Sequence, residues 1–286
     1  DNRMQAGLFT PDDLDLLTTI AASAAVAIEN ARLYQLAVEK GRMERELQMA
    51  LEVQSSLIPQ ETPQIDGWDF AAIWRPARVV GGDYYDFIPI AGTPAPQHGI
   101  LIADVSDKGM AAALFMALTR STVRASLLPG HTPAECITQA NRLISADAAH
   151  GMFVTCFYAQ LDPGKGELVY VNAGHNPPLV YSAAQNRLSE LTRTGAALGM
   201  IDDQIYGQRT ILLSRGDFIL LYTDGISEAM NTAQEQFGTD RLERTVLANR
   251  DAASAEIIAA VERAVNDFIG SAAVFDDITA LVVKRI

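Results

Sequence analysis

Four stretches of the chain place aspartate next to an apolar run. These aspartates are Asp83, Asp104, Asp224 and the adjacent pair Asp276–Asp277. One such residue is typical of a turn, but four that the fold brings together repel one another unless a cation or a proton intervenes. Because all-oxygen ligands suit Mg²⁺ or Mn²⁺ better than Zn²⁺, the pattern predicts a site for two divalent metal ions.

Glycines flank several of these aspartates. Gly81 and Gly82 come directly before Asp83, and Gly225 follows Asp224. Glycine has no Cβ, so another group can approach its backbone closely. We attribute these glycines to a close approach between the backbone and the metal ions.

Other polar residues near these stretches have less distinctive surroundings. His175, in NAGHNPP, could act as a general acid, but we expect it to shape a turn through hydrogen bonds to backbone carbonyls. Lys108 could face a substrate phosphate or solvent, and solvent is the expectation. The histidines expected at the surface are His98, His131 and His150.

The composition excludes several classes of function. The chain has 286 residues, 49% of them hydrophobic, which suffices for one large domain or two small ones. A formal net charge of −13 argues against a broad nucleic-acid-binding face. Cys136 and Cys156 lack the spacing of a zinc site and predict buried thiols in a reducing cytosol.

Location is predicted from what the sequence lacks. The chain has no run of about 18 apolar residues, so no membrane span is expected. Its start, DNRMQAGLFT, has neither the basic beginning nor the apolar core of a signal peptide. A cytoplasmic protein is therefore predicted.

The N-terminal part reads as one long helix over residues 11–58. Thr10 and Pro11 fit an N-cap followed by proline in the first turn, and no further proline occurs before Pro59. Such a helix would be roughly 70 Å long. Its second half has a heptad-like seam of Leu36, Met43, Leu47, Ala50 and Leu57, with Lys40 and Gln54 at the two remaining seam positions. The seam predicts a coiled-coil homodimer, and a helix packed on its own domain is the alternative.

After Pro59 short strands alternate with turns, and a few helices interrupt them. The expected helices are 109–128, 133–148, 239–249 and 254–269. The expected strands include RVVGGDYYDFIPI, WDFAAIWRPA, HGILIADVS, FVTCFYAQLD, GELVYVNAG, PLVYSA, QRTILLSRGD, FILLYTDG and DITALVVKRI. LDPGKGEL predicts a hairpin turn, and Tyr84 and Tyr85 should point to opposite faces, one inward and one outward. The class is α+β.

Five motifs in order carry a family resemblance. GGDYYD, DVSDKG before an alanine-rich helix, NAGHNPPLV, LYTDGISEA and DDITALVV resemble the SpoIIE-like branch of the PPM superfamily over about residues 66–286. Members are metal-dependent serine/threonine phosphatases related to protein phosphatase 2C. The resemblance implies a four-layer α/β/β/α sandwich of two antiparallel sheets flanked by helices.

The resemblance also implies roles for individual residues. Asp104 would bridge two Mn²⁺ or Mg²⁺ ions with the Val105 carbonyl as a further ligand, and Asp83 would hold the first ion. Asp224 and Asp276 would hold the second, although Asp277 could replace Asp276. The implied reaction is hydrolysis of a phosphoserine or phosphothreonine monoester by a metal-activated water. The implied substrate is a phosphoprotein, an anti-sigma-factor antagonist.

The N-terminal segment resembles the closing helix of a GAF sensory domain that runs into a signalling helix. This predicts a GAF-like remnant at residues 1–32, a coiled-coil signalling linker at 33–60 and a PPM-type domain at 61–286. The dimeric helix would pass the state of an upstream sensor to the metal loop through the helix at 109–128. No nucleic-acid or membrane partner is expected.

Two other functions compete with an active phosphatase. A phosphatase fold could serve only as an interaction module, but every expected aspartate is present. GGDYYD also shares its first three residues with the GGDEF signature of nucleotide cyclases. The aromatic residues that follow, and the later TDG and DDIT motifs, disfavour a cyclase.

Overall fold

A computed structural model describes residues 10–90, 96–148 and 151–286. His150, predicted at the surface, lies outside these ranges. The chain divides into two compact units between Ala50 and Leu51. The second unit thus begins earlier in the chain than the predicted domain boundary at residue 61.

The second unit is a sandwich of strands and helices. The helices of the chain are α1 (Pro11–Leu57), α2 (Met110–Ser126), α3 (Pro133–Asp147), α4 (Asp224–Ser227), α5 (Thr239–Ala248) and α6 (Ser254–Ile269). The first five strands are β1 (Trp68–Arg75), β2 (Tyr84–Ile90), β3 (Gln97–Val105), β4 (Val154–Asp162) and β5 (Glu167–Ala173). The remaining strands are β6 (Leu179–Ser182), β7 (Arg187–Glu190), β8 (Arg209–Leu212), β9 (Phe218–Tyr222) and β10 (Ile278–Arg285).

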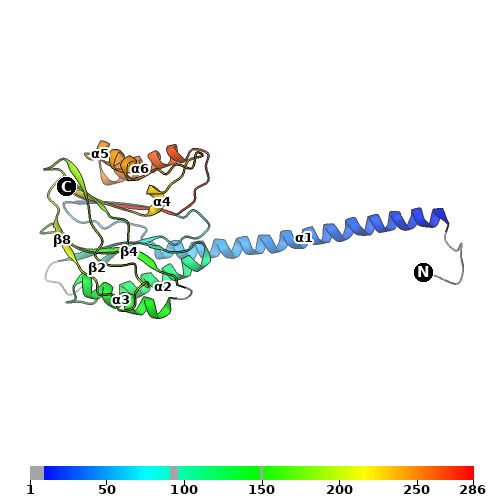
Figure 1. Ribbon diagram of the computed structural model, residues 1–286, viewed down its shortest axis with the longest axis horizontal. Coiled ribbons are helices and arrows are strands. Elements are labelled where there is room, and N and C mark those ends of the chain that lie inside the picture. The colour runs from blue at the N-terminus through cyan, green and yellow to red at the C-terminus, as the bar shows by residue number, and fades with distance from the viewer. Residues whose placement is uncertain (1–9, 91–95, 149–150) are drawn as a thin grey trace. The chain divides into compact units, whose positions relative to one another are not determined.

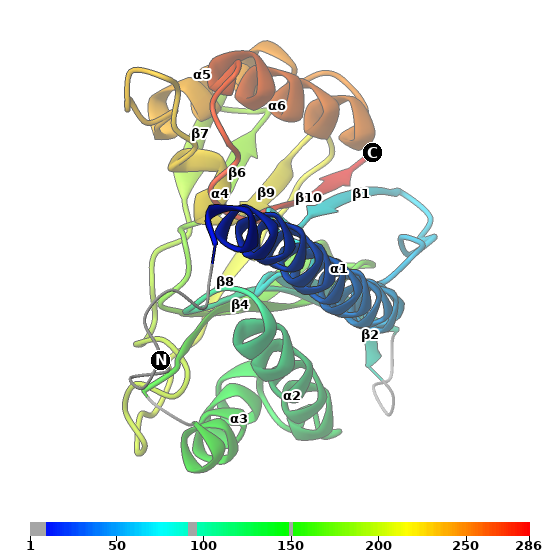
Figure 2. The same ribbon diagram turned by 90° about the vertical axis from the view of Figure 1, so that its right-hand side faces the viewer.

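The strands form two five-stranded sheets in which every pairing is antiparallel. One sheet has the order β1-β10-β9-β6-β7 and the other β2-β3-β4-β5-β8. Helices α5 and α6 cover the first sheet, and α2 and α3 cover the second (Figures 1 and 2). The predicted four-layer sandwich is confirmed.

The central strands β3, β4, β9 and β10 are buried on both faces, which explains their nearly continuous apolar sequences. In β9, Ile219 and Leu221 enter the core cluster shared by the two sheets, whereas Phe218, Leu220 and Tyr222 pack in the cluster with α5 and α6. This is the two-residue alternation of a strand with apolar layers on both sides. The same burial corrects one prediction: Tyr85, at 7% exposure, is buried like Tyr84 at 0%.

Most predicted elements match the structure closely. The four helices expected after Pro59 begin and end within two residues of α2, α3, α5 and α6. The hairpin turn lies where expected, because Asp162 and Glu167 pair across the β4–β5 connection. The sequence reading missed β7, a short polar strand at a sheet edge, and α4, which is a single turn.

Helix α1 begins at Pro11, as predicted. Before Leu51 its large apolar side chains are exposed, for example Leu17, Ile28 and Met43. Contrary to the expectation from the sequence, an 18-residue stretch within it is long and apolar enough to cross a membrane by length and composition. Because core helices and signal sequences satisfy the same criterion, this finding alone gives weak support for a span.

The last turns of α1 belong to the second unit. Ile58, just after the helix, and Gln54 are each 4% exposed there. Gln54 therefore packs into its own domain and does not occupy a free position of the predicted coiled-coil seam. For this end of the helix, the alternative of packing on its own domain is correct.

Candidate metal centre

Asp83 lies at the start of β2 and is almost fully buried, at 2% exposure. The hydroxyls of Thr223 and Thr279 each donate a hydrogen bond of 2.7 Å to its Oδ2 atom. Burial raises the pKa of Asp83 well above its usual range, and the charges of Asp104 and Asp277 act in the same direction. Because both hydroxyls are neutral, these hydrogen bonds supply no positive charge to balance the carboxylate.

Asp104 and Asp224 are half-buried at the ends of two different elements. Asp104 is near the end of β3, and Asp224 is the first residue of α4. Burial, with the charges of Asp224 and Asp276, raises the pKa of Asp104 to about 8. Burial, with Asp276 and Glu228, raises the pKa of Asp224 to about 6 against the opposing effect of Lys108. Because these carboxylates perturb one another, they share one region of the fold.

The two adjacent aspartates before β10 have different surroundings. Asp277 is 8% exposed, and its carboxylate accepts hydrogen bonds from the backbone N–H groups of Ala77, Gly82 and Asp83 at 2.7, 2.7 and 3.3 Å. The side chain of Asp276 is 35% exposed; its Oδ1 atom accepts one hydrogen bond from the Asp277 N–H at 3.0 Å, and its Oδ2 atom accepts one from Lys108 at 2.6 Å. Asp276 is therefore the more accessible of the two carboxylates and the better candidate for a metal ligand, whereas backbone N–H groups bond both oxygens of Asp277.

The glycines are explained by contacts within the protein. A Cβ on Gly81 would overlap the Asp277 carboxylate, and one on Gly225 would overlap the Asp277 carbonyl oxygen. A Cβ on Gly82 would lie 3.0 Å from the Val105 carbonyl oxygen. The glycines let four chain segments approach one another. These contacts within the protein explain the glycines without a close approach of their backbone to a metal ion.

The prediction that Lys108 faces solvent is wrong, because its ammonium contacts other residues of the protein. Its Nζ atom donates to Asp276 Oδ2 at 2.6 Å and to the Phe275 carbonyl at 2.9 Å. It also lies 4.0 Å from the centroid of the Phe275 ring. The nearby acidic side chains attract the ammonium more strongly than the sequence around Lys108 suggested.

The donor set fits hard divalent cations. Asp83, Asp104, Asp224, Asp276 and the Val105 carbonyl offer oxygen only, and burial together with neighbouring carboxylates raises the pKa of each of the first three. In the described part of the chain, no three His, Cys, Asp or Glu side chains already have the geometry of a metal site. The carboxylates are therefore gathered but not closed around an ion.

His175 has the environment of a structural residue. It is 1% exposed, and its Nδ1 atom lies 2.8 Å from the Thr155 hydroxyl. Burial lowers the pKa of His175 to about 3, so the ring is neutral near neutral pH and the imidazolium form of a general acid is not populated. His131 is exposed as predicted, whereas His98 is half-buried.

Sequence reasoning missed several residues that position the centre. Besides Thr223 and Thr279, the Gln54 amide donates to the Gly81 carbonyl at 2.6 Å and accepts from the Gly81 N–H at 3.1 Å. Asp86, 1% exposed, accepts two hydrogen bonds from Arg124, which ties β2 to α2. The threonines adjoin the aspartate motifs and could have been suspected, but no sequence signal marks the other two contacts.

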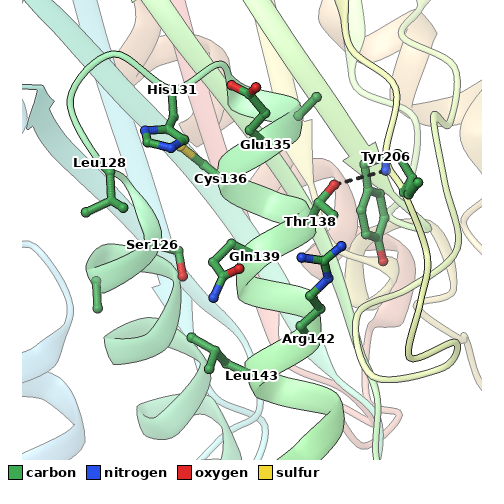
Figure 3. Close-up of a pocket in the computed structure, with 13 residues that line it drawn as sticks. Ser126, Leu128, His131, Glu135, Cys136, Thr138, Gln139, Arg142, Leu143 and Tyr206 are labelled. Atoms are coloured by element: carbon green, nitrogen blue, oxygen red, sulfur yellow. Dashed lines mark hydrogen bonds between the residues drawn. The ribbon is translucent and has the colours of Figure 1, made fainter.

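A cavity of about 540 Å³ lies away from these carboxylates. The end of α2, helix α3 and the segment around Tyr206 form its walls, with Leu128, Arg142 and Leu143 among the lining residues (Figure 3). The Tyr206 N–H donates to the Thr138 hydroxyl at its edge. None of the candidate metal ligands lines it, so its size is no guide to where the chemistry occurs.

Comparison with known proteins decides the family. The model of the family described as Stage II sporulation protein E (SpoIIE) matches residues 94–286. The chain belongs to this family. It contains a PP2C-type serine/threonine phosphatase domain, in agreement with the order of the aspartate motifs along the fold.

Two curated relatives cover different lengths of the chain. Protein IcfG of Synechocystis is 31% identical over 278 residues, which are 87% of this chain and 43% of the relative. Phosphoserine phosphatase RsbU of Bacillus subtilis is 34% identical over 183 residues, 64% of this chain and 53% of the relative. The chain thus spans about half the length of these relatives.

Solved structures support the fold. The SiaA-PP2C domain of Pseudomonas aeruginosa has a TM-score of 0.75 at 19% identity, covering 87% of this chain and 98% of that domain. RsbX, solved in complex with magnesium, has a TM-score of 0.56 at 12% identity and covers 78% of this chain and 98% of its own. At these identities the likeness extends to the fold alone.

Proposed function

We propose that this protein is a metal-dependent phosphatase that hydrolyses phosphoserine or phosphothreonine in a protein substrate. The observation that carries the proposal is the gathering of four carboxylates from distant segments, Asp83, Asp104, Asp224 and Asp276, with too little positive charge around them. By contrast, Asp86 accepts hydrogen bonds from Arg124, and Asp277 accepts them from backbone N–H groups. The magnesium complex of the fold neighbour RsbX supports the choice of ion.

Each carboxylate has a place in the proposed centre. Asp104 would bridge two Mn²⁺ or Mg²⁺ ions with the Val105 carbonyl beside it, Asp83 would hold the first ion, and Asp224 with Asp276 the second. The bound ions supply an activated water and neutralise charge on the phosphoryl oxygens. The hydroxyls of Thr223 and Thr279 orient Asp83, and the glycine contacts let the segments that carry the carboxylates come close together.

The proposed substrate is a phosphorylated regulatory protein, an anti-sigma-factor antagonist. The relative RsbU is named a phosphoserine phosphatase, which supports a phosphoserine substrate. A net charge of −13 disfavours nucleic acid as a partner. A cytoplasmic location fits this substrate class and the two buried free thiols.

Regulation is proposed to reach the centre through α1. Gln54, near its end, bonds both backbone groups of Gly81, two residues before Asp83. A shift of the helix end would therefore move the glycine turn directly, in addition to the route through α2 expected from the sequence. Dimerisation through the exposed apolar residues of α1, and a GAF-like sensor that passes its state to this helix, complete the proposal.

Hydrolysis of p-nitrophenyl phosphate and of a phosphoserine peptide, measured with and without Mn²⁺, tests the function. Asp104→Asn and Asp224→Asn should each lower kcat/KM by about 10³ or more, since each removes a ligand of a metal that drives the reaction. Asp251→Asn, at a side chain 89% exposed in a turn after α5, is the matched control and should retain full activity. Mn²⁺ binding without any turnover would favour the interaction-module alternative.

A further inference from the structure

Lys108 is held in the loop between β3 and α2 by three contacts from one neighbouring segment. They are the ion pair with Asp276, the hydrogen bond to the Phe275 carbonyl and the position of the ammonium over the Phe275 ring. Its side chain is 30% exposed. An ammonium with a carboxylate, a carbonyl and an aromatic face around it is fixed more firmly than an ordinary surface lysine.

The ammonium is paired directly with one of the candidate metal ligands. In residues 10–90, 96–148 and 151–286, Lys108 forms the one ion pair with any of the four candidate ligands, Asp83, Asp104, Asp224 and Asp276. Its charge also reaches Asp224, whose pKa it lowers against the effect of burial. Arg124 pairs with Asp86 and Arg75 with Glu262, whereas Arg78 lines the same small hollow as Lys108 and Asp276.

A divalent ion and this ammonium cannot both keep their full contact with Asp276. Two positive groups that share one carboxylate repel each other strongly at separations of a few ångströms. The contact of Lys108 with Asp276 therefore has to weaken when a metal ion binds there. The Lys108 side chain is 30% exposed and Phe275 is 72% exposed, which leaves the ammonium room to turn outward.

We propose that Lys108 is a built-in counterion of the second metal site, which holds Asp276 while that site is empty and is displaced when the ion binds. Lys108 is thus a positioning residue that sets the affinity of the second ion. This inference rests on the proposed function, because it assumes that Asp276 is a metal ligand. It adds that the Lys108 ammonium, a cation of the protein itself, pairs with Asp276 when no metal ion is bound there.

Calorimetric titration of the metal-free protein with Mn²⁺ tests the proposal without an activity measurement. Lys108→Met keeps the length of the side chain and removes the charge, so the weaker of two Mn²⁺ sites should bind about tenfold more tightly while the tighter site changes little. Lys108→Arg keeps the charge and is the matched control, with wild-type affinity expected. Phe275→Ala removes the ring that holds the ammonium and should tighten the weaker site by about threefold.

The outcomes separate this inference from the proposed function. Equal Mn²⁺ affinity in the wild type, Lys108→Met and Phe275→Ala would overturn it, and a raised KM for phosphopeptide in Lys108→Met would then assign Lys108 to the substrate phosphate. If the wild type bound no Mn²⁺ at all, the proposed function would fail instead. Circular dichroism identifies a misfolded variant, and Phe275→Ala keeps the test decisive should Lys108→Met fail to fold.

Discussion

Two sets of carboxylates in the same domain differ in how the protein compensates them. Asp86 is met by the guanidinium of Arg124, and Asp277 by three backbone N–H groups. Asp104 and Asp224, also removed from solvent to a large extent, have neighbours that are mainly other carboxylates. The protein thus supplies hydrogen-bond donors to the carboxylates of the first set, whereas the second set has mainly negative neighbours.

This difference separates structural from functional acids. A buried charge without a partner destabilises the fold, so a protein that supplies full partners to Asp86 and Asp277 could have done so for the others. Under-compensated carboxylates in a cluster are characteristic of sites that act on an external group. The following experiments test that separation.

Asp86→Ala should give the largest change in stability. It leaves Arg124 without its partner, at a cost of about 3 kcal/mol, the low end for a broken buried pair because Arg124 is 39% exposed and can regain water. Urea unfolding measures the change. The double variant Asp86→Ala/Arg124→Ala should cost less than the two single changes added, and strict additivity would mean that the pair is not coupled.

Mn²⁺ should stabilise the wild type because it binds only to the folded centre. At a concentration 100 times its Kd, the gain is about 2.7 kcal/mol and appears as a higher Tm. Asp104→Asn should lose most of this gain, and Asp86→Ala should retain it in spite of its lower starting stability. A gain of equal size in Asp104→Asn would place the bound ion elsewhere.

The neighbours Asp276 and Asp277 should respond in opposite ways to the same change. Asp277→Asn replaces an acceptor with a donor that faces backbone N–H groups, and should destabilise the fold by about 2 kcal/mol. Asp276→Asn breaks only a partly exposed ion pair, worth about 0.5 kcal/mol, but should abolish binding of the second Mn²⁺ ion. Chemical denaturation and calorimetry together measure both effects, and the reverse pattern would exchange the two roles.

His175 should have a smaller effect on stability than Asp277, and its effect should depend on pH. Its pKa of about 3 in the folded protein lies below the ordinary 6.5, so the stability it contributes is present above pH 6.5 and is lost as the pH falls below that value. Between pH 7.5 and 5.5 the wild type should lose about 1.4 kcal/mol through this group. In His175→Asn that part of the loss should disappear, and an unchanged pH dependence of unfolding would show that the pKa of the ring is the same in the folded and unfolded states.

The sequence predicted the elements of this fold better than their contacts. Strand and helix periods and the five ordered motifs were enough to predict the sandwich, because these signals lie within short segments. The same motifs gave the aspartates that are proposed as metal ligands. The partners of Lys108 and Gln54 were not predictable, since Asp276 and Gly81 are distant in sequence. Likewise, alternation assigned Tyr84 and Tyr85 to opposite faces but could not show that both faces are covered.

The choice between Asp276 and Asp277 shows the same limit. Both follow Phe275 and precede the same strand, so the sequence left them open as alternatives. Only the structure shows that the backbone of residues 77–83 takes up the oxygens of Asp277. Which groups bond a given carboxylate therefore has to be determined from the three-dimensional contacts.

An anomalous-scattering map from crystals soaked in Mn²⁺ tests the central claim most directly. The account predicts two peaks about 3.5–4 Å apart, with Asp104 between them, Asp83 beside one and Asp224 with Asp276 beside the other. Asp277 should keep its bonds to the backbone. Peaks bound by Asp277, or no peak among the four carboxylates, would contradict it.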